Sequence, residues 1–262
     1  MEVRSLGLRT DLALLGYGGS EIEDHGDHLV VRTPANPSYW WGNFLLLAEP
    51  PADAAPWLAR FEEVHPLARH RAFAVDGTDV STEELAPFAA AGLVLEGAAV
   101  MTATSVHPPP RPHTEAEFRA FASDEDWAQR IELSVATDTQ HGEAAYREFA
   151  VPKAAGDRAL VEQGRGQWFG AFLDGRLVTS MGLVAVEGGL ARFQSVQTHP
   201  DARGRGLAGT LVHHVARHGF DTFGAHTLVM VADPDYLAIR VYASVGFAET
   251  ERTAQAELAP PD

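Results

Sequence analysis

The sequence contains no cysteine, and its acidic residues far outnumber its basic ones. Without cysteine the chain can form neither a disulfide framework nor a thiolate zinc site, and it has no thiol nucleophile. No apolar run approaches the length of a membrane span, and the first 20 residues lack the apolar stretch of a signal peptide. We therefore expect a cytoplasmic protein with no membrane partner.

The formal net charge is −16, from 36 acidic and 20 basic residues. Such a chain lacks the basic surplus that neutralises phosphates, so we expect no nucleic-acid partner. An acidic surface attracts cationic substrates such as amines, and it also simply keeps a protein soluble. At 262 residues the chain has room for one large domain or two moderate ones.

One segment, VHPPPRPH over residues 106–113, divides the chain. Three successive prolines favour a stiff, extended connection that is neither a helix nor a central strand. We place an N-terminal domain at residues 1–106, a proline-rich linker at residues 107–112 and a second domain at residues 113–262.

The second domain is predicted to mix helices and strands. A strand over residues 115–123 comes first, then a helix capped by Ser123, then a helix over residues 142–164 that is interrupted near Pro152. Asp174-Gly175 and Gly188-Gly189 are strong hairpin signals. They predict an antiparallel meander of three strands, over residues 167–173, 176–187 and 190–199. The helices and strands expected after the meander cover residues 206–220 (helix), 226–232 (strand), 234–247 (helix) and 248–258 (strand).

Gly204, Gly206 and Gly209 form the pattern G-x-G-x-x-G, which is typical of nucleotide-binding turns. A dinucleotide-binding Rossmann unit would also present a strand, glycines, a helix, a strand and then an acid such as Asp233. Three features disfavour that interpretation. The glycines follow an antiparallel meander, five residues separate the strand from Gly204, and only 29 residues follow Asp233.

Two spaced motifs instead resemble the GNAT superfamily of acetyl-CoA-dependent N-acetyltransferases. The run RGRGLA at residues 203–208 fits the family's R/Q-x-x-G-x-G/A loop. The run DYLAIRVY at residues 235–242, with Gly246-Phe247 after it, resembles the N-x-x-A-x-x-x-Y element and its G-F corner. The resemblance covers about residues 113–258. It implies an α+β (mixed α/β) GNAT fold with a central, mostly antiparallel sheet, and acetyl-CoA as the co-substrate.

The residue types in the first motif suit a bound phosphate. Unpaired N–H groups and the dipole at a helix start attract anions, and glycines let the backbone bend and approach a pyrophosphate. The resemblance further implies that the preceding strand end pairs with the pantetheine arm as an added strand would. The expected coenzyme-binding residues are Val196, Gln197, Thr198, Arg203, Gly204, Arg205, Gly206, Leu207, Ala208, Gly209, Asp235, Ala238 and Tyr242.

Tyr242 is the predicted catalytic residue. The resemblance implies that it protonates the departing coenzyme A thiolate, as a general acid. The alternative is a core tyrosine that packs its helix. Asp235 stands where the family often has asparagine, and an aspartate can still cap the helix. The general base stays open among Asp233, Glu132, Asp138, His141 and Glu143.

Three histidines lie on the predicted helix after the glycines: His213, His214 and His218. The last two are spaced i, i+4, which can hold a metal. There is no H-E-x-x-H arrangement, so we interpret them as a solvated helix face and expect no metal.

Residues 1–106 lack a glycine loop but repeat the pattern of the second domain. YWWGNFLLLAEPP at residues 39–51 parallels LARFQSVQTHP, and the stretches after it parallel the glycine-loop helix, the buried strand and the last helix and strand. We infer a degenerate acetyltransferase-like domain in which Glu49-Pro50-Pro51 replaces the phosphate loop and binds no pyrophosphate. We favour core packing for Tyr39, Trp40 and Trp41 over lining an acceptor pocket.

The resulting hypothesis is a tandem N-acetyltransferase with one competent coenzyme site. It would move an acetyl group to a primary amine by direct attack within a ternary complex. We expect a small-molecule amine, with a protein N-terminus or lysine as the other option. The alternatives are transfer of another acyl group, a non-catalytic acetyl-CoA sensor and a scaffold without a ligand. The tandem arrangement also resembles mycothiol synthase, but the N-terminal half is shorter here. The patterns encode neither the acceptor's identity nor the oligomeric state.

Overall fold

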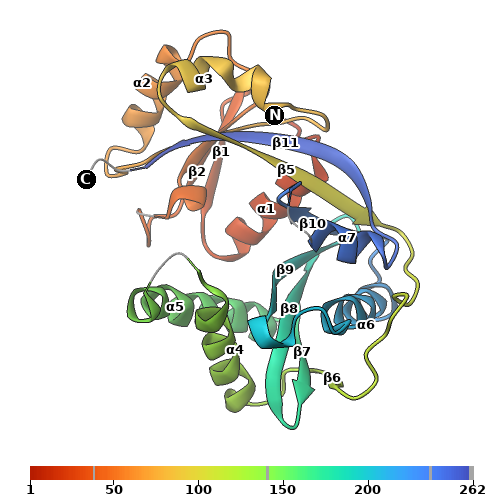
Figure 1. The fold of residues 1–262 in the computed structure, drawn as a ribbon. Helices are drawn as coiled ribbons and strands as arrows, with labels where there is room; N and C mark the ends of the chain where they lie inside the picture. Colours follow the sequence, from red (N-terminus) through yellow and green to blue (C-terminus); the bar gives the residue numbers. More distant parts are fainter. Residues whose placement is uncertain (38, 140–141, 236–237, 260–262) are drawn as a thin grey trace. The chain divides into compact units, whose positions relative to one another are not determined.

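A computed structural model describes residues 1–37, 39–139, 142–235 and 238–259 (Figure 1). The chain forms two compact units, neither of which is continuous in sequence. The first unit contains Met1–Met101, Val231–Tyr236 and Glu249–Asp262, and the second contains Thr102–Met230 and Leu237–Ala248. Residues 249–259, which belong to the predicted second domain, therefore group with residues 1–101. The functional division of the chain into a degenerate part, a linker and a catalytic part stays a prediction.

The strands of the second unit form the predicted meander. β6 (Glu117–Ala120), β7 (Gly166–Leu173), β8 (Arg176–Val186) and β9 (Leu190–Thr198) pair antiparallel in sequence order, and β10 (Thr227–Ala232) pairs parallel to β9. Both hairpin turns are left-handed: φ is 49° and 78° at Asp174-Gly175, and 75° and 71° at Gly188-Gly189. Two successive residues with positive φ define the turn that best matches the twist of paired strands.

The helices of the second unit are α4 (Asp124–Thr137), α5 (Glu143–Glu162), α6 (Leu207–Asp221) and α7 (Ala238–Ala243). The predicted cap of α4 is confirmed, because Ser123 and Asp126 form a reciprocal capping box. The predicted interruption near Pro152 is wrong, since α5 continues through that residue. Its packing explains this: Asp157 on α5 forms a buried ion pair with Arg130 on α4, and Lys153 donates to the same carboxylate at 2.6 Å.

The first unit is built on strands in the order β1–β2–β3–β4–β11–β5. They are β1 (Glu21–Asp24), β2 (His28–Arg32), β3 (Phe44–Leu47), β4 (Arg71–Val75), β11 (Ala248–Leu258) and β5 (Val94–Ala103). β3 and β4 are parallel, while β1–β2, β2–β3 and β4–β11 are antiparallel. The helices are α1 (Leu6–Tyr17), α2 (Ala55–Val64) and α3 (Ala86–Ala90).

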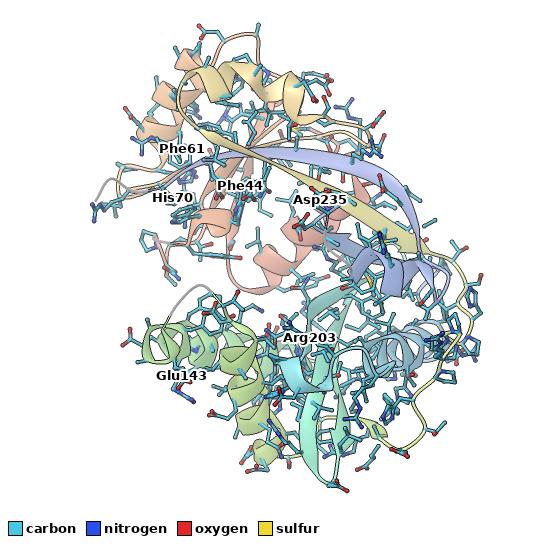
Figure 2. The ribbon with its side chains drawn as sticks, viewed as in Figure 1. Phe44, Phe61, His70, Glu143, Arg203 and Asp235 are labelled. Carbon is cyan, nitrogen blue, oxygen red and sulfur yellow. The ribbon has the colours of Figure 1, made fainter. Side chains whose placement is uncertain are left out.

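Among the described residues of the first unit, alternation along the strands places apolar side chains in two separate clusters. Phe61, Phe73 and Phe88 belong to one cluster, in which the rings of Phe73 and Phe88 stack at 4.4 Å. Phe44 and Leu12 belong to the other. Figure 2 labels Phe44 and Phe61, which come from β3 and α2. Neighbouring strand residues such as Phe44 and Leu45 thus enter opposite clusters, as a strand with a repeat of two requires.

The two units repeat one order of elements. In the second unit, α6 connects the parallel strands β9 and β10; in the first, α2 connects the parallel strands β3 and β4. A short helix then leads to a glycine with positive φ and a long strand, with Gly246 at φ 110° in one case and Gly92 at φ 92° in the other. The predicted repetition is therefore present in the fold.

Strand β11 is tied into the first unit by side chains as well as by pairing. The Glu251 carboxylate accepts from Ser5 Oγ at 2.7 Å and from Leu6 N at 3.0 Å, at the start of α1. Trp41 Nε1 donates to Glu257 at 3.1 Å. The carboxylate of Glu251 therefore fills the anion position that a helix N-terminus offers.

The aromatic run before β3 behaves largely as predicted. Trp41 packs near Phe44, with ring centroids 5.6 Å apart, and Trp40 stacks on His70 at 5.7 Å. Tyr39 is exposed. Core packing therefore describes both tryptophans, and Tyr39 is the exception.

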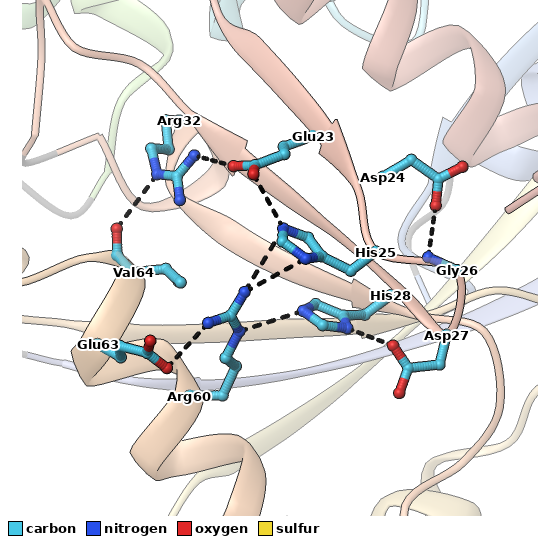
Figure 3. Close-up of polar contacts among 10 residues, drawn as sticks. All are labelled: Glu23, Asp24, His25, Gly26, Asp27, His28, Arg32, Arg60, Glu63 and Val64. Atoms are coloured by element: carbon cyan, nitrogen blue, oxygen red, sulfur yellow. Dashed lines mark hydrogen bonds and ion pairs between the residues drawn. The ribbon is translucent and has the colours of Figure 1, made fainter.

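A polar network joins the β1–β2 hairpin to α2 (Figure 3). The rings of His25 and His28 stack at 4.8 Å, and Arg60 on α2 contacts nitrogens of both rings. Asp27 lies 2.6 Å from His28 Nδ1, and the hydrogen bond to His28 lowers the pKa of Asp27. Every charged group in this network has a partner of the first unit, so we interpret it as structural.

His65 is a buried histidine whose charge opposes folding. Burial, and then the nearby charge of Arg32, lower its pKa to about 4, and its Nε2 has no hydrogen-bond partner among the described residues. An unfolded histidine takes up its proton near pH 6.5. Stability should therefore fall as the pH drops from about 6.5 to about 4, because only the unfolded chain binds the proton there.

Melting temperatures measured between pH 7 and pH 4.5 would check this expectation. The His65→Gln variant should lose less of its melting temperature on acidification than the parent does. Parallel profiles for the two proteins would contradict it.

Among the described residues, no helix combines the length and the apolar character that crossing a membrane requires.

Candidate functional site

The glycine-rich loop opens α6 as the first motif predicts. Gly204 and Gly206 have φ of 73° and 80°, in the region that side chains disfavour, and α6 begins at Leu207. Within the described residues, none of the N–H groups of residues 204–209 donates a hydrogen bond, and the first helical bond is from Thr210 N to Gly206 O. These six donors therefore remain for an anion, and the helix dipole favours negative charge at the same place.

The proline-rich segment lies against this loop. A cavity of about 440 Å³ is lined by Arg111–Glu115 on one side and Gly204–Gly206 on the other. His113 N donates to Thr210 Oγ1 at 2.9 Å, in the first turns of α6. A Cβ at Gly206 would overlap the carbonyl oxygen of Arg111. Two features therefore favour glycine at residue 206: its positive φ, and the close approach of the Arg111 carbonyl, which leaves no room for a Cβ atom.

Strand β9 separates from its parallel neighbour before it ends. Its register with β10 covers only Leu190 to Arg192, although β9 continues to Thr198. The antiparallel register with β8 shifts between Ser180 and Gly182, and Ser195 in the shifted part has a φ of 50°. A bulge of this kind leaves backbone groups outside the regular ladder, which is how a strand can accept an extended ligand.

The predicted residues at the end of β9 are held by neighbours that the motifs did not indicate. Gln197 Oε1 accepts from Ser134 Oγ on α4 at 2.8 Å, and Thr179 Oγ1 donates to Thr198 Oγ1 at 3.3 Å. Arg203, labelled in Figure 2, donates from Nε to Thr198 O at 3.2 Å. The glycine loop and the end of β9 are thereby joined into one local structure.

The remaining loop residues take distinct positions. Leu207 is 1% exposed and packs with Ala171, Val178 and Ala202. Ala208 is half-buried and Gly209 is buried, and a Cβ at Gly209 would lie 3.3 Å from Pro109 Cβ. The small residues in the first turn of α6 thus leave room for the proline-rich segment. The family resemblance did not predict this reason for their small side chains.

Tyr242 is buried in the second unit. It is 6% exposed, its ring centroid lies 6.5 Å from that of Phe247, and its carbonyl accepts from Phe247 N at 3.2 Å. Burial is compatible with the catalytic interpretation and with core packing, so the catalytic role stays a prediction. Ala238, four residues earlier on α7, is half-buried.

Asp235, labelled in Figure 2, is the exposed first residue of the second motif. Its N–H donates to Asp233 Oδ1 at 2.8 Å. Tyr236 and Leu237, between Asp235 and α7, lie outside the described residues. The capping expected of Asp235 depends on them and stays a prediction.

The candidates for the general base differ in their surroundings. Glu132 is bound by both terminal nitrogens of Arg147, and this hydrogen bonding lowers its pKa, so it is a poor proton acceptor. Glu143 is exposed in the first turn of α5 (Figure 2). Asp138 follows α4, and its charge, after burial, raises the pKa of Tyr146. His141 lies outside the described residues.

The helix histidines pack against aromatic rings. His214 and His218 contact Phe169 edge-on, with ring centroids 5.9 and 4.9 Å apart, and His218 also contacts Phe223 at 4.9 Å. Burial lowers the pKa of His213, His214 and His218. The interpretation as a solvated face is therefore wrong for His218, because its side chain belongs to an aromatic cluster that the helical spacing alone did not indicate.

In the first unit, the loop before α2 corresponds to the glycine loop, and an aspartate side chain of this loop accepts a hydrogen bond at the start of α2. Asp53 Oδ1 accepts from Ala55 N at 3.0 Å where α2 begins, and Pro56 in the same turn has no N–H group. A carboxylate therefore occupies the start of α2, whereas the start of α6 offers unbound donors. This contrast supports the prediction of a single coenzyme site.

Comparisons with known proteins match part of the chain to a protein family and nearly all of it to solved structures. Residues 126–247 match the Acetyltransferase (GNAT) family. No curated protein matches the sequence. Among solved structures, a GCN5-related N-acetyltransferase from Kribbella flavida is 15% identical, with a TM-score of 0.64, covering 98% of this chain and 97% of that one.

Two further structures extend the comparison. A tandem GNAT protein from the clavulanic acid biosynthesis pathway is 15% identical, with a TM-score of 0.57, covering 95% of this chain and 89% of that one. A conserved protein of unknown function from Staphylococcus epidermidis ATCC 12228 is 10% identical, with a TM-score of 0.72, covering 91% and 93%. At these identities the similarity shows the fold, which is the predicted mixed α and β GNAT fold with mostly antiparallel strands.

Proposed function

Because residues 126–247 of this chain match the GNAT acetyltransferase family, we propose that the protein transfers an acetyl group from acetyl-CoA to a primary amine. The finer parts of this proposal are the acceptor class, the single coenzyme site and the residues that act. A small-molecule amine is the acceptor, and the net charge of −16 favours the approach of such cations.

The main observation behind the proposal is that the backbone N–H groups at the start of α6 have no hydrogen-bond acceptor within the described residues. Six consecutive N–H groups donate to no partner within the described residues, and a cavity of about 440 Å³ lies beside the loop. This arrangement suits the pyrophosphate of acetyl-CoA. The part of β9 that lacks register with β10 suits the pantetheine arm, with Val196, Gln197 and Thr198 along it.

The reaction proceeds by direct attack. The neutral amine nitrogen bonds to the thioester carbonyl carbon, the carbon–sulfur bond breaks and the sulfur leaves as a thiolate. The amine gives up a proton to a base, directly or through water, and Tyr242 gives its proton to the thiolate. Binding both substrates in one site supplies much of the acceleration, because the attack then needs no further loss of translational freedom.

Calorimetric titration of acetyl-CoA into the purified protein tests the proposal, with NADH as the control ligand. We expect saturable binding of one acetyl-CoA per chain and no binding of NADH. A screen of primary amines, with release of coenzyme A as the readout, then identifies the acceptor. Absence of acetyl-CoA binding would overturn the assignment, and binding without turnover of any amine would favour the sensor alternative.

A further inference from the structure

We propose that Arg111, in the proline-rich segment, binds a phosphate of acetyl-CoA together with Arg205. The inference rests on the proposed function and adds to it a residue that lies outside both family motifs. It also gives the end of the predicted linker, Arg111 and Pro112, a place in the lining of the cavity beside the glycine loop.

The backbone around Arg111 is fixed against α6. His113 N donates to Thr210 Oγ1 at 2.9 Å, and Thr210 Oγ1 in turn donates to Gly206 O at 2.9 Å. The absence of side chains at Gly206 and Gly209 lets the Arg111 carbonyl and Pro109 approach the helix closely. The position of Arg111 relative to the glycine loop is therefore set by packing and hydrogen bonds.

The side chains at this cavity leave two positive charges without partners. Arg111 and Arg205 both line it, and neither guanidinium has a hydrogen bond or ion pair with any described residue. In a chain with net charge −16, other exposed arginines of the second unit do form ion pairs, for example Arg217 with Asp221 at 2.7 Å and Arg147 with Glu132. Two unpaired guanidiniums beside six unbound N–H groups are suited to an anion of more than one charge.

Glu115 is the opposing group in the cavity. It lines the same space, and its own N–H donates to His113 Nδ1 at 3.3 Å. Its carboxylate repels a phosphate, so removing its charge should act in the opposite direction to removing the charge of Arg111. The pair of substitutions therefore reports on charge in the cavity and not on loss of packing.

Acetyl-CoA carries two phosphate groups that a guanidinium could bind, the pyrophosphate and the 3′-phosphate of the ribose. The two share the same chemistry, a tetrahedral anion whose paired oxygens match the fork of an arginine. Comparing acetyl-CoA with its 3′-dephospho analogue separates them, because the analogue keeps only the pyrophosphate.

The experiment is calorimetric titration of the full chain and three variants with both ligands at several salt concentrations. Arg111→Gln should weaken acetyl-CoA binding about tenfold, as expected for one charge-assisted contact in an open site. Glu115→Gln should tighten it. Arg217→Gln, at the far end of α6, removes the same charge away from the cavity and should leave the affinity unchanged.

The salt dependence of the affinity should also become weaker in Arg111→Gln, which a purely structural role of the side chain would not cause. If the loss disappears with the dephospho analogue, Arg111 binds the 3′-phosphate; if it persists, Arg111 binds the pyrophosphate. Equal affinities for the parent, Arg111→Gln and Arg217→Gln would overturn the inference while leaving the proposed function intact. Failure of the parent to bind acetyl-CoA would overturn the proposed function itself.

Discussion

Acetyl-CoA affinity should fall by more than about 100-fold in the Gly206→Glu variant. Three effects act together at this residue. A side chain is strained at a φ of 80°, its Cβ overlaps the Arg111 carbonyl, and its carboxylate competes with a phosphate for the N–H groups that open α6. Titration calorimetry with acetyl-CoA measures the change.

Gly175→Glu is the matched control for this prediction. Gly175 has a φ of 78° in the β7–β8 turn, and a Cβ there would meet no atom within 4 Å, so the substitution adds the same charge and the same backbone strain in open space. It should leave acetyl-CoA binding unchanged. A Gly206→Glu variant that melts like the control and still binds acetyl-CoA normally would remove the glycine loop from the coenzyme site.

Turnover should fall by about 100-fold in Tyr242→Phe, with little change in acetyl-CoA affinity, because loss of a general acid affects the departure of the thiolate and not the binding of phosphates. The ring and its contact with Phe247 are kept, so the fold should be preserved. The alkaline limb of the pH–rate profile should also change, since a general acid must carry its proton to act.

Release of coenzyme A can be followed with a thiol-reactive dye, and the absence of cysteine from the chain means that the protein adds no signal. Tyr17→Phe, in α1 of the first unit, is the control for loss of a tyrosine hydroxyl. Equal turnover in Tyr242→Phe and the parent would exclude Tyr242 from the mechanism and favour the core-packing interpretation.

Features set by a few neighbouring residues could be predicted from the sequence. Asp174-Gly175 and Gly188-Gly189 placed two turns correctly, because few residues tolerate two successive positive φ angles. Ser123 placed the start of α4 for a similarly local reason. Pro152 led to a wrong prediction of a helix break. A proline destabilises a helix locally, but here the packing of α5 against α4 offsets that cost, and this packing cannot be read from the residues next to the proline.

The parts of the candidate site that escaped prediction depend on contacts over long sequence separations. Ser134 holds Gln197 across 63 positions, and His113 binds Thr210 across 97. Ser195 adopts a positive φ although serine gives no signal for it, because the bulge is imposed by pairing with β8. Motifs found the glycine loop itself, but they could not show that the proline-rich segment forms its opposite wall.

The pairing of β11 with β4 has a consequence for synthesis of the protein. The two strands are separated by roughly 180 residues. At ribosomal rates of about 5–20 residues per second, β11 is synthesised on the order of ten seconds or more after β4. During that time β4, with Phe73 and Val75, is an open sheet edge of the kind that pairs with other chains. The first unit therefore begins to emerge from the ribosome before the second unit but is completed after it. A nascent chain stalled between β4 and β11 would expose the unpaired edge of β4 to pairing with strands of other chains.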